Sequence, residues 1–168
     1  MFLISSMVKI SKIKILLYSS EYWPFYDLIK VNLQKMGCEV DTYIYEQKNS
    51  PFKYLHELLY LKKTNYKKYD IIHAFFGTSA FIANIQRSVP VITTFCGSDL
   101  LGVIDKSGDY NFIKSYIFKV VSNIAYRLSK QTTTLSKKLQ CQLPNEKKNS
   151  IIPLGIDTDH FKPQDMFK

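Results

Sequence analysis

Hydrophobic and polar positions alternate in blocks along the chain, and its short apolar runs predict six β-strands. Several of these runs are nearly continuous in apolar residues, which is typical of parallel strands that are covered on both faces. Most are bounded by polar or turn-forming residues, as short buried strands usually are. The predicted strands span residues 14–18, 39–45, 71–75, 89–95, 131–135 and 150–154.

Helical patterns fill the intervals between these runs. Residues 25–36 and 79–87 carry apolar side chains at helical spacing, and another helix is predicted to open at Pro51. The longest pattern, over residues 110–128, repeats apolar positions at steps of three and four. Ser136 can cap a last short helix.

This order of elements predicts the fold class. Strand and helix alternate six times, which favours an α/β fold with one Rossmann-like, doubly wound parallel sheet and helices on both faces. The 168 residues allow about one domain. We expect an N-terminal extension over residues 1–12 and the domain over 13–153. The alternation is lost in 154–168, which predicts an exit segment or linker.

Composition narrows the class of protein. Hydrophobic residues make up 46% of the chain and charged residues 22%, which are globular values and disfavour disorder, collagen and coiled coil. The net charge is +9, yet only Arg87 and Arg127 are arginines. Proteins that recognise nucleic acids rely mainly on arginine side chains, so we predict no nucleic-acid partner. A lysine-rich surface suits weak attraction to anionic membranes or substrates.

One segment could make such a membrane contact. Residues 51–68 interleave leucines and tyrosines with five lysines, the composition of a basic helix at a membrane surface. The alternative, which the pattern favours, is an ordinary crossover helix with a solvated lysine face. The three cysteines, Cys38, Cys96 and Cys141, match no metal or disulfide spacing. With no signal-peptide pattern, they predict a cytoplasmic protein, at most peripheral at the inner face of the membrane.

Candidate site residues follow the predicted strands, because ligands of open α/β sheets bind at the carboxyl ends of the strands. After the first strand come Glu21 and Trp23, with aromatic neighbours that could stack on a sugar or a lipid head. The alternative is that these rings cover the edge of the core. Neither a dinucleotide-binding nor a P-loop motif is present in the sequence. We therefore predict no such cofactor, and we expect no metal site.

The third and fourth predicted strands contribute further candidates. His73 lies near the end of the third, where a hydrogen-bonded core histidine is the alternative to a functional one. The fourth is followed by Cys96, Gly97, Ser98 and Asp99 and then by a long loop. Gly97 permits a close backbone approach, and the next two residues present polar groups. This stretch is the most informative of the chain.

Three stretches together resemble the N-terminal half of family 4 (group 1) glycosyltransferases of the GT-B type. They are YDIIHAFFGTSAFIA, VPVITTFCGSDLLG, and KQTTTLSKKLQCQL followed by IIPLGIDTDHFKP. Their order matches the family over about residues 14–163. Four positions depart from its pattern, among them Cys96, where a histidine usually stands, and Leu154, where an asparagine usually stands.

The resemblance implies a function and a site. It implies half of a GT-B architecture, the half that binds the acceptor of a retaining sugar transfer in cell-surface polysaccharide synthesis. The acceptor would be a glycan or a lipid-linked sugar, and the nucleotide-sugar donor would bind mainly to a second domain that this chain lacks. His73, Gly97, Ser98 and Asp99 would line the cleft, and Cys96 would stand in it in place of the usual histidine. Gly155 and Asp157 would begin the interdomain crossing.

Two expectations follow for activity. A retaining transfer needs stabilisation of the donor phosphates and positioning of the acceptor in one cleft, and a lone half supplies only the positioning. We therefore expect the chain to be inactive unless a separate donor-domain polypeptide completes it. The alternative is a non-catalytic module that binds a glycan or a lipid head, which the cysteine at position 96 favours.

Overall fold

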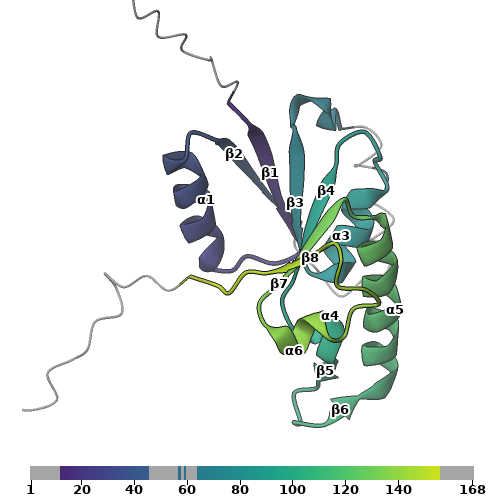
Figure 1. The fold of residues 1–168 in the computed structure, drawn as a ribbon. Helices are drawn as coiled ribbons and strands as arrows, with labels where there is room; N and C mark the ends of the chain where they lie inside the picture. The colour runs from purple at the N-terminus through teal and green to yellow at the C-terminus, as the bar shows by residue number, and fades with distance from the viewer. Residues whose placement is uncertain (1–11, 46–56, 58, 60–63, 156–168) are drawn as a thin grey trace, which may run out of the picture.

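The computed structural model describes residues 12–45, 57, 59 and 64–155. Within these residues six strands form one sheet, in which every neighbouring pair is parallel. The order is β2-β1-β3-β4-β7-β8, so the predicted Rossmann-like α/β fold is confirmed (Figure 1). The strands are β1 (Lys14–Ser19), β2 (Glu39–Ile44), β3 (Ile71–Phe75), β4 (Val91–Phe95), β7 (Gln131–Thr134) and β8 (Asn149–Ile151).

Helices cover both faces of the sheet, and the alternation of side chains along β1 shows how. Leu16 and Tyr18 belong to a core cluster with residues of α3 and α5, whereas Ile15 and Leu17 pack with Tyr26 of α1 on the other face. Figure 1 shows α1 on one side of the sheet and α3 with α5 on the other. The helices are α1 (Phe25–Lys35), α3 (Gly77–Asn84), α4 (Ser98–Leu101), α5 (Phe112–Leu128), α6 (Lys137–Gln140) and a 3-10 turn, η1 (Tyr66–Lys68).

Two predicted segments differ in detail. The long loop expected after β4 contains α4 and a small antiparallel hairpin of β5 (Val103–Ile104) and β6 (Tyr110–Asn111). The helix predicted over residues 110–128 begins two residues later, because the Asn111 side chain accepts a hydrogen bond of 2.9 Å from the backbone N–H of Lys114 and caps it. The helix predicted to open at Pro51, with the basic stretch after it, lies largely outside the described residues.

The orientation of α5 reverses the usual arrangement of a surface helix. Its buried residues are Ser115, Ser122, Ala125 and Tyr126, so apart from this tyrosine the packed face is made of small side chains. Most of the large apolar residues of the helix are exposed instead. The cause is the approach of α3, whose Gly77 lies so close to Ser122 that no larger side chain fits between the two helices.

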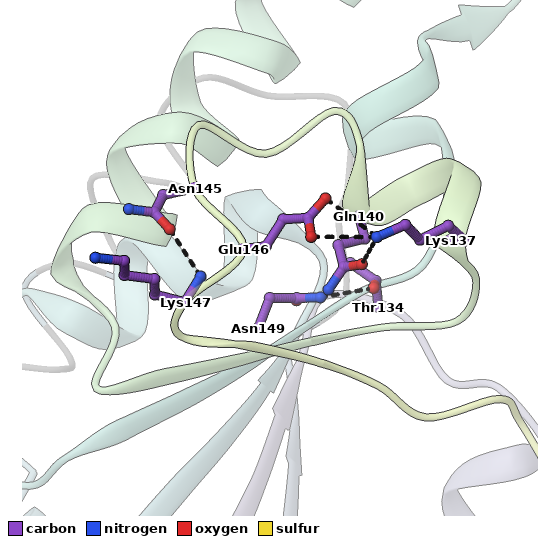
Figure 2. A network of polar contacts seen from close by, with 7 residues as sticks. All are labelled: Thr134, Lys137, Gln140, Asn145, Glu146, Lys147 and Asn149. Carbon is purple, nitrogen blue, oxygen red and sulfur yellow. Dashed lines mark hydrogen bonds and ion pairs between the residues drawn. The ribbon is translucent and has the colours of Figure 1, made fainter.

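A polar network holds the corner between β7, α6 and β8. Figure 2 shows the Lys137 ammonium donating to Gln140, 2.9 Å away, and pairing with the Glu146 carboxylate at 3.1 Å. Nearby, the Asn149 side chain donates to Thr134 Oγ1 at 3.0 Å and so links β8 to β7. These contacts orient β8 and the segment that leaves it toward α1.

Candidate functional site

The order of the strands places a crevice between β1 and β3. β1 has β2 on one side and β3 on the other, so the order of the strands reverses its direction across the sheet between β1 and β3. In open α/β sheets ligands bind at this switch point, beyond the carboxyl ends of the strands. A ligand site is therefore expected between the segments that follow β1 and β3.

A pocket of about 120 Å³ occupies this place. We call it the switch-point pocket. Four of the residues predicted from the sequence line it, namely Glu21, Trp23, Ser98 and Asp99. The other lining residues are Ser20, Phe76, Thr78 and Phe118.

Asp99 joins the two loops that form the pocket. Its side chain is 2% exposed, and its two carboxylate oxygens accept hydrogen bonds from the backbone N–H groups of Gly97 (2.8 Å) and Gly77 (3.1 Å). Burial raises the pKa of Asp99, while these backbone donors act in the opposite direction. The carboxylate thus ties the loop after β4 to the start of α3 and positions the pocket walls.

Glu21 is the exposed carboxylate of the pocket. It is the second residue after β1, and its carboxylate makes no hydrogen bond or ion pair with any described residue. Both of its oxygens can therefore accept hydrogen bonds from a ligand. Across the pocket, Ser98 and Thr78 offer hydroxyls from the first turns of α4 and α3.

Aromatic rings form the apolar part of the pocket. The Trp23 ring lies 6.4 Å from that of Phe76 and 6.5 Å from that of Phe25, and 42% of Trp23 is exposed. Phe76 itself has a φ of +66°, which is a strained backbone conformation for a bulky residue. Such strain concentrates at functional sites, and here it turns the chain from β3 into α3 beside the pocket.

The other predicted residues on β3 and after β4 do not line this pocket. His73 lies on the sheet face that carries α1, with its ring stacked on Phe75 and its Nε2 2.7 Å from Thr94 Oγ1. Thr94 continues the chain of hydrogen bonds to Thr133 on β7, at 2.6 Å. Burial lowers the pKa of His73 to about 4, so the imidazole is neutral at pH 7.

Cys96 and Gly97 lie in the loop after β4 and do not form part of the pocket surface. Burial, with the nearby Asp99 carboxylate, raises the pKa of Cys96 to about 12, which keeps its thiol protonated. Its sulfur lies 3.7 Å from the carbonyl oxygen of Thr94. Gly97 has a φ of +152°, a conformation in which a side chain would be strained.

The exit segment reaches α1. Gly155 is exposed, and a Cβ at this position would contact Leu28 of α1 at 3.6 Å. Asp157, the second predicted residue of the interdomain crossing, lies outside the described residues. Across the described parts of the chain, no group of three or more metal-ligating side chains comes together. The described helices include none with the length and hydropathy needed to cross a membrane.

Four pocket residues were not predicted. Ser20 directly follows β1 and Thr78 lies three residues after β3, so the strand-end rule that selected Glu21 could have selected them as well. Phe76 shows its role only through its backbone conformation. Phe118 comes from the middle of α5, and no sequence signal connects it to a strand end.

The chain matches no known family model and no curated protein. The fold is therefore established by the sheet itself, as a single parallel α/β sheet of six strands within the described residues.

Proposed function

We propose that the chain binds a sugar of a glycan or of a lipid-linked acceptor in the switch-point pocket, as the acceptor side of a retaining glycosyltransferase. The observation that carries the proposal is the composition of this pocket. Its lining contains two carboxylates, three hydroxyls and three aromatic rings, but no lysine or arginine. Carboxylates accept hydrogen bonds from sugar hydroxyls, and aromatic rings pack on the apolar faces of sugar rings.

The same composition argues against a phosphate-bearing ligand in this pocket. Phosphate sites use arginine, lysine or glycine-rich loops, and a nucleotide here would face the carboxylates of Glu21 and Asp99. The volume of about 120 Å³ is also below the roughly 300–1,000 Å³ of typical small-molecule sites. The pocket therefore suits one small neutral group, such as a single sugar unit at the end of an acceptor.

Within this proposal Glu21 has the central role. It can accept a hydrogen bond from the acceptor hydroxyl, orient that hydroxyl and receive its proton, while Trp23 supports the sugar ring. Stabilising the donor phosphates requires cations that the pocket lacks, so a second domain or polypeptide must provide them. This division of labour agrees with the resemblance of the three sequence stretches to the N-terminal half of family 4 glycosyltransferases.

A second candidate is a module that binds a glycan or a lipid head without catalysis. The neutral side chains of Cys96 and His73 favour this non-catalytic module. The raised pKa of Cys96 and the lowered pKa of His73 leave neither side chain charged at pH 7. Since His73 also lies outside the pocket, Glu21 is the only exposed acid–base group among its lining residues.

Binding is tested by saturation-transfer NMR with a panel of monosaccharides and short glycans. We expect Trp23→Ala to weaken sugar binding by about tenfold, the value of one aromatic contact, and Glu21→Gln to weaken it as well. Tyr22→Ala is the matched control, because Tyr22 is an exposed neighbouring ring that bonds to Asp27 and does not line the pocket. Equal effects of the Tyr22 and Trp23 substitutions would contradict the proposal.

Turnover separates the two candidates. Nucleotide-sugar consumption is measured after a donor-domain polypeptide is added to the chain. Turnover that collapses in Glu21→Gln supports the transferase, whereas sugar binding without turnover supports the module. Asp99→Ala is a poor probe of chemistry, because it also removes the acceptor of the Gly77 and Gly97 amides and so alters the loops.

A further inference from the structure

The outward face of α5 is a continuous apolar surface. Six residues spaced three or four apart lie on one side of this helix, and each is 40% to 75% exposed. Exposed apolar surfaces of this kind mark sites of interaction with another protein or with a membrane. We call this surface the α5 stripe, and it consists of Ile113, Tyr116, Ile117, Val120, Ile124 and Leu128.

The exposure of the stripe follows from the packing of the opposite face. Ser122 and Ala125 are fully buried against the neighbouring α3, and Gly77 allows the two helices to approach closely. Turning the stripe inward would require large side chains where the structure has room only for small ones. The stripe is therefore a fixed outer surface of this helix.

Charge indicates what kind of partner fits the stripe. Helix α5 contains Lys114, Lys119 and Arg127 and no acidic residue, and the whole chain carries a net charge of +9. Lys114 pairs with Asp105 at 3.5 Å, but two copies that met through this face would still bring together the four remaining cations of the two helices, which disfavours a dimer. An apolar helix face bordered by cations suits a bilayer that contains anionic lipids.

A second feature lies at the C-terminal end of the stripe. Leu128 of the stripe also lines a pocket of about 530 Å³ at the amino edge of the sheet, which we call the basic pocket. Arg87, Lys130 and Lys148 line the basic pocket, and no acidic residue does. Arg87 and Lys130 form no ion pair or hydrogen bond with described residues through their side chains. Their charges are thus available to an anion, and a phosphate matches the guanidinium in geometry.

We propose that the α5 stripe and the basic pocket form one membrane-binding surface for anionic phospholipids. The stripe packs into the boundary between headgroups and acyl chains, and the basic pocket receives a lipid phosphate at its end. This surface differs from the basic segment 51–68 that the sequence suggested. It is also independent of sugar binding, because none of the residues that form this surface lines the switch-point pocket.

The test is co-sedimentation of the full chain with phosphatidylcholine vesicles, with and without phosphatidylglycerol. We expect binding that requires the anionic lipid and weakens with salt. The double substitution Ile113→Ser and Ile117→Ser should weaken it about tenfold or more. Val31→Ser on α1 with Met36→Ser at the C-cap of that helix is the matched control, because both residues are also exposed.

A second pair of variants tests the basic pocket. Arg87→Gln and Lys130→Gln should each weaken binding to anionic vesicles about fivefold, whereas Lys35→Gln and Lys106→Gln, at exposed sites outside it, should have less effect. Three results would overturn the proposal. The first is vesicle binding that neither the isoleucine variants nor the basic-pocket variants change. The second is binding of inorganic phosphate without binding to vesicles. The third is a dimer that the isoleucine variants dissociate, again without binding to vesicles. Circular dichroism verifies that each variant is folded.

Discussion

Gly77→Ala should destabilise the fold, because the methyl group would enter the contact between α3 and α5. A Cβ at this position would meet Ser122 Oγ and would lie 2.7 Å from Ser122 Cβ and 2.8 Å from its Cα. Since the last of these is a backbone atom, a side-chain rotation cannot relieve the overlap, and the two helices must separate. Overpacking of this kind costs about 1–3 kcal/mol.

One opposing effect reduces this cost. Replacing glycine by alanine in a helix interior stabilises it by about 0.5–1 kcal/mol, and Gly77 is the first residue of α3, where the gain is smaller. The substitution also moves the Gly77 amide that donates to Asp99, which loosens the wall of the switch-point pocket. We therefore expect a net loss of about 1–3 kcal/mol in the free energy of unfolding.

Urea denaturation measures this loss, and two variants control it. Gly155→Ala should change the stability little, because its Cβ would make an ordinary contact of 3.6 Å with Leu28. Adding Ser122→Gly to Gly77→Ala should recover part of the loss, since it removes the side-chain atoms of the clash but leaves the Cα. If Gly77→Ala is as stable as the wild type, the close approach of α3 and α5 is not what sets the orientation of α5.

Three further predictions concern buried polar and backbone features. Ser122→Ala should stabilise the fold by about 1 kcal/mol in denaturant titrations, because Ser122 Oγ is buried without a partner among the described residues. Gly97→Ala should destabilise it by about 1–3 kcal/mol by backbone strain, as thermal unfolding would detect. The pKa of His73 is about 4 when folded and 6.5 when unfolded, so the unfolded state binds more protons in this interval. Stability should then fall by at most about 3 kcal/mol from pH 6.5 to 4, and this fall should vanish in His73→Gln.

The strands could be predicted because each one carries its signal locally. A buried parallel strand reads as a short apolar run, and all six predicted runs correspond to strands of the sheet, with ends that differ by up to three residues. α4 and the hairpin of β5 and β6 were not predicted, since four-residue and two-residue elements are too short to show a period. Their positions depend on tertiary contacts, such as the bond from Val103 N to Ser115 Oγ on α5 (2.8 Å).

The site could be predicted in part, for a geometric reason. In a parallel sheet the residues that follow the strands meet at one edge, which brings Glu21 and Trp23 next to Ser98 and Asp99. His73 is two residues before the end of β3, and its side chain lies on a face of the sheet rather than at its edge. Position within a strand thus explains why His73 is absent from the pocket. Cys96 and Gly97 also follow a strand and do not line it, so position after a strand alone was not sufficient.

The orientation of α5 shows what hydrophobic periodicity can and cannot report. The apolar repeat over this helix is the usual signature of a face turned toward the core, but in the structure the buried residues of the helix are Ser115, Ser122 and Ala125 with a single large one, Tyr126. Side-chain size decides this packing, because Gly77 opposite Ser122 allows only a narrow interface. The repeat itself shows only that the helix has one apolar face, and it does not distinguish a face that suits the protein interior from one that suits a bilayer. An apolar repeat opposite a row of small residues, on a helix with cations only, therefore favours a helix with two separate contacts, one with its own domain and one with a lipid surface.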